Sequence, residues 1–195
     1  HAENPDYYYM NTDTKILCEY VLRPYLRQMT GESFIIDSEK KMSFTRDQLV
    51  EVLTYIKDCY DGGVFEPAED SATFKGQIHT NPKWMDGKFV FAYGPSSSIN
   101  LLMDAVPEAE CTVVQMPMAK DRINDGFFAD TPQYMTVNKN SEHVEEAVDF
   151  LNYFYNSAEA QETLKDVRSI PPTSTARQLC ADKGLLNQTV VDAVD

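Results

Sequence analysis

Glycine, histidine and long apolar runs are scarce in this sequence, and each scarcity argues against a class of function. Only eight glycines occur among 195 residues, and they form neither G-x-G-x-x-G nor G-x-x-x-x-G-K, the glycine-rich loops that bind phosphate groups. The apolar runs are a few residues long, far short of a membrane-spanning helix. Basic residues number 17 against 31 acidic ones, a net charge of -14. That charge disfavours binding to nucleic acid or to an anionic membrane.

The four cysteines are too scattered for a metal or redox motif. They lie at positions 18, 59, 111 and 180, with no C-x-x-C and no neighbouring histidine pair. Zinc sites and thioredoxin-type redox sites both require close spacing, so we do not expect either. Cys18 and Cys59 fall within helical apolar patterns and are predicted to be buried thiols. For Cys18, Cys59, Cys111 and Cys180 the sequence leaves disulfide pairing open.

The usual constellations for catalysis are missing too. The turn GPSSS has Ser98 where the nucleophile elbow of a serine hydrolase requires a second glycine. Only three histidines are present to act as a base. A glycosidase needs two carboxylates at a defined separation, and the many acidic residues give no means of choosing a pair. We therefore expect no catalytic residue, no metal site and no cofactor.

Apolar periodicity predicts helices in the first third of the chain. Residues 13–29 have helical recurrence, with a kink or an end at Pro24. A hairpin with a polar turn at residues 38–40 is expected next. Thr45 and Gln48 then form a capping-box signature that opens the clearest helix, which the Gly62-Gly63 pair ends. Its apolar stripe consists of Leu49, Val52, Leu53, Ile56 and Cys59.

Strands and helices alternate in the remainder. Strands are predicted at residues 88–93 and 111–116, with a short helix at 96–105 between them. Residues 118–126 are predicted to form a polar turn that marks the domain boundary. Residues 127–137 are predicted to be mostly extended. Ser141 is expected to cap a helix with Val144, Val148 and Leu151 on one face. A helix at 157–165 and a helical region after Pro171-Pro172 follow. The alternation predicts an α/β fold with helices covering a small sheet.

Aromatic residues are abundant and clustered. There are 11 tyrosines and 10 phenylalanines, and Tyr7-Tyr8-Tyr9 and Phe127-Phe128 are consecutive. Aromatic faces beside hydroxyl and amide groups suit sugar rings, which combine apolar C–H faces with hydroxyl rims. A second interpretation stays open: one member of each cluster packs inside while its neighbour covers the surface.

Four segments also follow one another in an informative order. Residues 43–67 read SFTRDQLVEVLTYIKDCYDGGVFEP, an apolar helix that ends in a Gly-containing turn before a proline. Residues 83–98 read KWMDGKFVFAYGPSSS, with a Gly-Lys pair, an apolar strand and Gly-Pro. After them come CTVVQMPMAKD and DGFFADTPQYMTVNKNSEHVEEAVDFLNYFYNSAEAQETL, followed by SIPP. In this order and spacing the segments resemble carbohydrate-type extracellular solute-binding proteins of ABC importers.

The resemblance implies a periplasmic-binding-protein-like α/β lobe, with a small sheet covered by helices, plus the segment that returns to a second lobe. Full members are about twice as long, so the chain is expected to be the C-terminal half of one. Residues 1–125 would form most of the C-terminal lobe. Residues 126–195 would hold the hinge crossover and the helices that return toward the N-terminal lobe.

The resemblance also implies a solute site. In that family a small molecule binds between two lobes that close by hinge bending. The turn after Tyr93 and the extended piece from Gly126 are expected to line one crevice. Asp130 has two interpretations, accepting sugar hydroxyl bonds or forming a turn before a Thr-Pro pair. The predicted solute-binding residues are Tyr8, Tyr9, Ser96, Ser97, Phe127, Phe128 and Asp130.

The expected function is capture of a sugar or oligosaccharide for delivery to the membrane permease of an ABC importer, without an enzymatic step. The implied location is extracellular, either lipid-anchored at the cell surface or periplasmic. Three alternatives remain: a carbohydrate-active hydrolase, a receptor of the same fold for a peptide or polyamine, and a structural or adhesive surface domain. With one cleft wall missing, residues 1–195 alone are expected to bind solute weakly.

Overall fold

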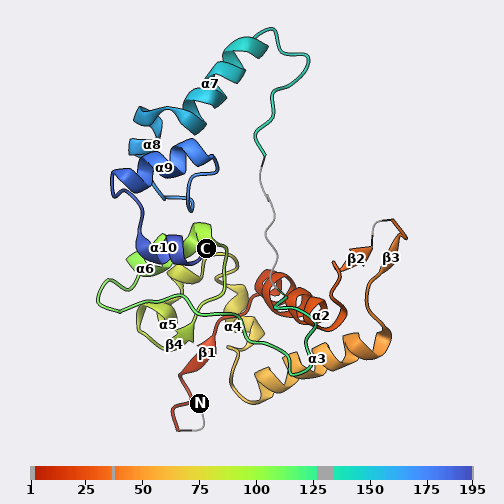
Figure 1. The fold of residues 1–195 in the computed structure, drawn as a ribbon. Helices are drawn as coiled ribbons and strands as arrows, with labels where there is room; N and C mark the ends of the chain where they lie inside the picture. The colour runs from red at the N-terminus through yellow and green to blue at the C-terminus, as the bar shows by residue number, and fades with distance from the viewer. Residues whose placement is uncertain (1–2, 37, 127–133, 195) are drawn as a thin grey trace. The chain divides into compact units, whose positions relative to one another are not determined.

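The computed structural model describes residues 3–36, 38–126 and 134–194, and its backbone divides into two compact units (Figure 1). The first unit comprises His1–Gly94, Leu101–Glu110 and Val114–Phe128. The second comprises Pro95–Asn100, Cys111–Val113 and Ala129–Asp195. Phe127, Phe128 and Asp130, three of the predicted solute-binding residues, lie outside the described residues.

A small parallel sheet forms the centre of the first unit. Strand β1 (Tyr8–Met10) pairs in parallel with β4 (Phe89–Phe91), so that Met10 lies opposite Phe91 (Figure 1). An isolated parallel bridge joins Met10 to Phe65 on the other side of β1. The sheet with its surrounding helices confirms the predicted α/β class. The strand at β4 was predicted, whereas the one at β1 was not.

Helices flank this sheet, beginning with one continuous helical run after β1. The run consists of α1 (Thr14–Ile16), the π-helical turn η1 (Leu17–Leu22) and α2 (Arg23–Thr30). The sequence predicted either a kink or an end of the helix at Pro24. An end there is wrong, because the helix continues to Thr30. Proline lacks an N–H and crowds the preceding turn. Here the wider π turn, closed by Arg23 N–H donating to the Cys18 carbonyl, immediately precedes it.

The next elements follow the sequence pattern closely. Strands β2 (Ile35–Ile36) and β3 (Lys41–Met42) make the predicted antiparallel hairpin. Thr45 caps the start of helix α3 (Arg46–Asp61): its hydroxyl accepts from Gln48 N–H while the Gln48 side chain accepts from Thr45 N–H, which confirms the capping box. The apolar stripe is confirmed except for Leu53, which is exposed because it lies one residue around the helix from buried Val52.

The hydrophobic core of the first unit lies between this stripe, α2 and the sheet. Cys18 is exposed, so its predicted burial is wrong: Ile16 and Val21 are the residues that this part of the helical run buries. Cys59 is buried as predicted. The buried members of the core are Met10, Val21, Leu26, Val52, Ile56, Cys59 and Phe65.

Short helical elements lead into and out of β4. They are α4 (Ala68–Ala72), η2 (Ile78–Thr80) and α5 (Pro82–Met85) before the strand, and η3 (Ser96–Ser98) and α6 (Ile99–Asp104) after it. The predicted strand at residues 111–116 is wrong. No described segment pairs with it, and Val113 and Val114 stay exposed. Without a neighbouring strand, an apolar run has no ladder to join.

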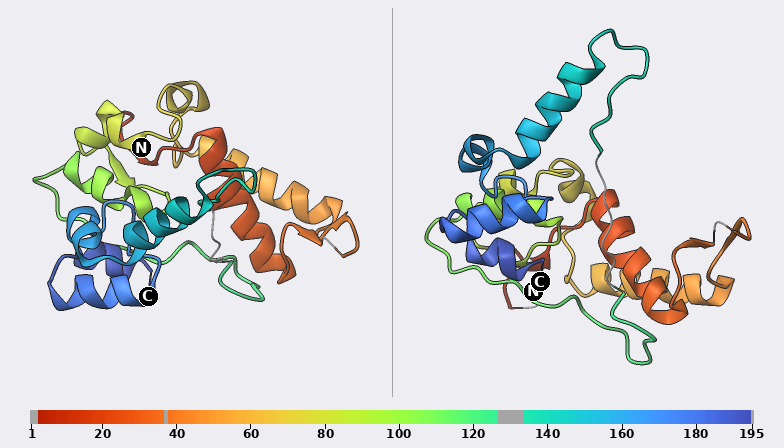
Figure 2. Two further views of the ribbon diagram at one scale, coloured as in Figure 1. Left: turned by 90° about the horizontal axis from the view of Figure 1, so that it is seen from above. Right: turned by 45° about the horizontal axis from the view of Figure 1, so that its top comes forward.

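The second unit is helical from residue 144 onward (Figure 2). It contains α7 (Val144–Asn156), α8 (Ala158–Leu164), α9 (Ser174–Asp182) and α10 (Gln188–Asp192). Helix α8 packs against α9 beside one end of α7. Ser141 does not cap α7 directly, since its hydroxyl accepts from His143 N–H and the helix begins at the next residue. Within the described residues, no helix has the length and apolar content needed to cross a membrane.

Candidate functional site

The two predicted tyrosines lie on β1 and face opposite ways, as alternation along a strand requires. Tyr8 is partly buried, with its ring 6.5 Å from that of Phe89 and with Lys83 Nζ 5.1 Å from its ring centre. Tyr9 is 50% exposed. Of the two rings, Tyr9 therefore presents the larger surface to a solute.

The two predicted serines lie in η3, directly after the Gly94-Pro95 turn. Ser96 Oγ is 2.7 Å from Ser169 Oγ, so the two hydroxyls share a hydrogen bond. Ser96 and Ser97 are both partly buried. They belong to the second unit, whereas Tyr8 and Tyr9 belong to the first.

The carboxyl ends of the parallel segments form a polar edge that the sequence did not reveal. Asn11 follows β1, Glu66 follows the bridge residue Phe65, and Ala92 and Tyr93 follow β4. In open α/β sheets the carboxyl ends of strands are the usual side for ligands. Burial raises the pKa of the Tyr93 hydroxyl well above its ordinary value, so this phenol stays protonated across the physiological range.

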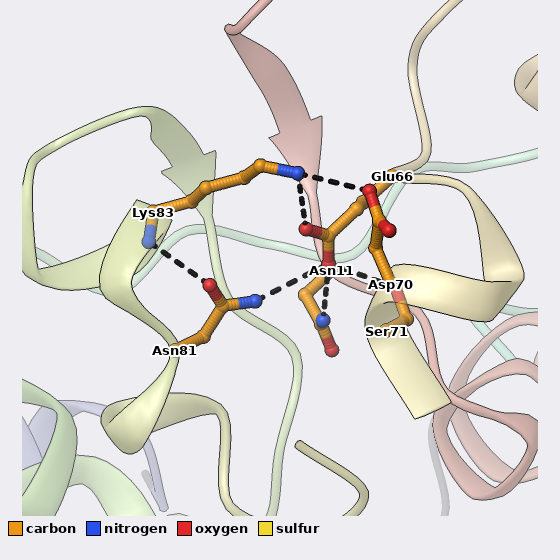
Figure 3. Close-up of polar contacts among 6 residues, drawn as sticks. All are labelled: Asn11, Glu66, Asp70, Ser71, Asn81 and Lys83. Carbon is orange, nitrogen blue, oxygen red and sulfur yellow. Dashed lines mark hydrogen bonds and ion pairs between the residues drawn. The ribbon is translucent and has the colours of Figure 1, made fainter. Parts of the chain in front are cut away.

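A buried carboxylate organises that edge (Figure 3). Glu66 accepts hydrogen bonds from Asn11 Nδ2 at 2.7 Å, Ser71 Oγ at 2.9 Å and Asn81 Nδ2 at 3.2 Å. Lys83 Nζ adds a charged partner at 2.8 Å from Glu66 and also reaches Asp70 at 3.2 Å. Because four donors surround its carboxylate, Glu66 acts as a structural anchor.

The electrostatics of Lys83 agree with that role. Burial alone would lower the pKa of Lys83, but its hydrogen bonds and charge interactions with Glu66 and Asp70 outweigh the burial and raise the pKa above its ordinary value. Lys83 therefore stays charged at any physiological pH. The Asn11 amide oxygen is buried without a hydrogen-bond partner, and in Figure 3 it points away from Glu66. The amide nitrogen of Asn11 donates to the Glu66 carboxylate.

A second device fixes the segment that leads into the predicted crossover. Gln28 on α2 is buried, and its Nε2 donates to the carbonyls of Pro117 at 3.1 Å and Asp125 at 2.9 Å. Its Oε1 accepts from Ala119 N–H at 2.7 Å, and its own carbonyl accepts from Ile123 N–H. One side chain thus holds three points of residues 117–126 against α2.

Gly126 completes this contact with α2. Its φ is +75°, and a Cβ at that position would lie 2.6 Å from the Pro24 carbonyl oxygen and 2.8 Å from Gln28 Cγ. Only glycine fits so close an approach. The sequence signal for Gln28 was present but unused: it lies four residues after buried Pro24, on the same face of α2.

In the second unit, a loop between α8 and α9 is tied to the segment that carries Ser96. Asp166 is buried, and its Oδ2 accepts from Asn187 N–H at 2.6 Å. Its carbonyl accepts from Asn100 Nδ2 at 3.1 Å, and Asn187 Nδ2 donates to Asn100 Oδ1 at 3.2 Å. Together with the Ser96–Ser169 bond, these contacts fix where the hydroxyl of Ser96 lies.

These arrangements suit binding through hydroxyls, amides and an aromatic face. Among the described residues no group of three or more His, Cys, Asp or Glu side chains could hold a metal ion. Neither imidazole of the described histidines, His79 and His143, bonds to a serine or cysteine; His143 meets the Ser141 hydroxyl only through its backbone N–H. The buried carboxylates among the described residues, Asp13, Glu66 and Asp166, all accept hydrogen bonds from donors of the protein itself.

A family comparison identifies relatives of the chain. The family model described as bacterial extracellular solute-binding protein matches residues 25–185. A search of curated protein sequences finds no match.

Solved structures with the same fold agree with that match. A periplasmic oligogalacturonide binding protein from Yersinia enterocolitica, in complex with saturated digalacturonic acid, superposes with a TM-score of 0.86 at 23% identity, over 98% of this chain and 48% of that one. The periplasmic solute binding protein ECA2210 from Pectobacterium atrosepticum gives 0.78 at 19% identity, over 98% and 49%. The structure of a de novo designed cysteine esterase gives 0.76 at 23% identity, over 98% and 48%. At these identities the likeness concerns the fold, and the chain spans about half the length of each match.

Proposed function

The chain belongs to the bacterial extracellular solute-binding protein family, and on this premise we propose that it captures a sugar or oligosaccharide for the membrane permease of an ABC importer. Membership confirms the family resemblance that the sequence suggested. It also confirms the predicted extracellular location. The observation that carries the proposal is the family match across residues 25–185. A structural neighbour at 23% identity is an oligogalacturonide binding protein, which supports a carbohydrate as the solute class.

The chemistry of the described residues supports the same class of solute. Tyr9 offers an exposed aromatic face on which a sugar ring can stack. Ser96 and Ser97 offer hydroxyls that can exchange hydrogen bonds with sugar hydroxyls. We keep all seven predicted residues as proposed contacts: Tyr8, Tyr9, Ser96, Ser97, Phe127, Phe128 and Asp130. Tyr9 and Ser96 are the strongest of them.

The length of the chain supports the proposed lobe arrangement. The chain covers about half of its structural matches. Residues 1–125 are proposed to form most of one lobe, and residues 126–195 the crossover and the helices that return toward a second lobe. A solute held between two lobes buries most of its surface, whereas one lobe leaves much of it wet. We therefore expect residues 1–195 alone to bind a sugar far more weakly than the complete protein does.

A thermal-shift screen tests the proposed solute class. The complete protein is heated with neutral sugars, digalacturonic acid, amino acids, peptides and polyamines in turn. Because a ligand that binds only the folded state raises the melting temperature, a sugar should give the largest shift. A shift with a peptide or polyamine and none with any sugar would overturn the solute class. Release of new reducing ends from an oligosaccharide during the incubation would favour a hydrolase instead.

A further inference from the structure

Two residues of the loop between α8 and α9 have a backbone conformation that side chains disfavour. Lys165 has φ +49° and Ser169 has φ +84°, and neither is glycine. An L side chain in this region crowds its own backbone, and glycine would relieve the crowding. Such outliers persist only where the surroundings enforce them, and they gather at functional sites.

The surroundings of Ser169 do enforce its position. Buried Asp166 fixes the loop through its bond from Asn187 N–H, and Ser169 N–H donates to the Asp166 carbonyl at 3.1 Å. Asn100 Nδ2 donates to the same carbonyl from the segment that begins with Ser96. The loop and that segment are therefore one hydrogen-bonded assembly within the second unit.

This assembly places the Ser169 hydroxyl 2.7 Å from that of Ser96. When two hydroxyls share one hydrogen bond, the pair still has one free O–H donor and several acceptor lone pairs. Both serines are partly buried rather than sealed from solvent. A neighbouring donor and acceptor in a fixed geometry match a sugar hydroxyl, which donates and accepts at once.

We propose that Ser169 is a further solute-binding residue, which acts with Ser96 as a two-hydroxyl contact for a hydroxylated solute. The inference rests on the proposed function and adds to it a residue from a different part of the chain. It also explains why a strained position has a serine: glycine would relax the backbone but would remove the hydroxyl.

Three variants of the complete protein separate this role from a merely structural one. Ser169→Ala keeps the strained backbone and removes the hydroxyl. Ser169→Gly removes both the hydroxyl and the strain. Lys165→Gly is the matched control, because it relieves strain in the same loop and leaves the Ser96–Ser169 pair intact. Each is measured by thermal melting and by titration with digalacturonic acid and with the neutral sugar that shifts the wild type most.

We expect both Ser169 variants to bind the sugar about tenfold more weakly, the effect of one lost hydrogen bond in a binding site. Ser169→Gly should nevertheless melt at a higher temperature than Ser169→Ala, since it no longer stores the strain. Lys165→Gly should melt above the wild type and bind within twofold of it. Equal losses of affinity in two Ser169 variants that differ in melting temperature would tie the loss to the missing hydroxyl rather than to stability.

The contrary outcomes are distinct. If the wild type binds a sugar and Ser169→Ala binds it equally well, the inference is overturned while the proposed function stands. Equal losses in Ser169→Ala and Lys165→Gly would show that loop conformation, not the hydroxyl, governs affinity, and would also overturn it. If the wild type binds no hydroxylated solute, the proposed function and the inference fail together.

Discussion

Helices α3 and α7 look alike in sequence and differ completely in what they bury. Both are apolar on one face and both form where the pattern predicts. Helix α3 buries Val52, Ile56 and Cys59 in the core of the first unit, with Val52 fully covered. Helix α7 buries no residue along its thirteen positions, and its Val148 and Phe150 are 51% and 57% exposed.

The difference teaches what an apolar pattern does and does not predict. Periodicity identifies a helix and the face that needs cover, but the covering surface belongs to another part of the structure. Helix α3 finds its cover in α2 and the sheet. If residues 126–195 return to a second lobe as proposed, the face of α7 that includes Val148 is where that lobe would pack.

The largest expected effect comes from truncating one side chain on each helix. Ile56→Ala should lower the free energy of unfolding of residues 1–195 by about 3 kcal/mol, because it leaves a cavity in a packed core. Val148→Ala, the matched change on α7, should cost less than about 0.5 kcal/mol in the same chain. Urea denaturation of both variants measures the two values. Similar losses would mean that α7 is covered within this chain.

A buried amide provides the next contrast. Gln28→Ala should destabilise the protein by about 2 kcal/mol, because it leaves the carbonyls of Pro117 and Asp125 and the Ala119 N–H without their partner. Asn152→Ala on α7 removes only an exposed hydrogen bond with Asn156 and should be close to neutral. Hydrogen exchange adds a local test: the Ala119 amide should lose protection in Gln28→Ala. Unchanged protection there would show that Gln28 does not hold residues 117–126 against α2.

The helix starts differ more modestly. Thr45→Ala should cost about 1 kcal/mol, since it removes the capping box at the start of α3. Ser141→Ala should have little effect on α7, because Ser141 bonds to His143 rather than capping the helix. Thermal melting of the two variants gives the comparison. An equal loss for Ser141→Ala would place the true start of α7 earlier in the chain.

The smallest effect concerns the thiol on α3. Burial raises the pKa of Cys59, with a partly opposing hydrogen bond from Tyr55, so at pH 8 it should react with a disulfide reagent far more slowly than exposed Cys18. A raised pKa in the folded state also means that stability falls as pH rises past the ordinary thiol value of about 8.5. Equal labelling rates for the two cysteines would show that the core around Cys59 opens readily to the reagent.

Local signals in the sequence predicted much of the fold. The Thr45–Gln48 pair, the hairpin before it and the helices after residue 141 all depend on neighbours within a few positions. Strand β1 was not predicted, because Tyr8–Met10 is held by partners some 55 and 80 residues away, at Phe65 and Phe91. The strand predicted at residues 111–116 is wrong, because this apolar run has no neighbouring strand to pair with among the described residues.

The candidate site was predictable only in part. The Gly-Pro turn and its serines were visible as a motif, and Ser96 does enter a fixed hydroxyl pair. Ser169 was not visible, because a serine before Ile-Pro-Pro gives no sign of its positive φ or of its contact with a residue 73 positions earlier. The role of Glu66 was not predictable, since its four donors come from three separate segments of the chain. Phe127, Phe128 and Asp130 stay predictions.

Isothermal titration of the complete protein with the best sugar from the screen, followed by chemical analysis of the recovered solute, tests the central claim most directly. We predict saturation at one sugar per protein and recovery of that sugar unchanged. Failure to saturate with any sugar, or recovery of a shortened one, would contradict the account of a receptor that holds its solute and releases it intact.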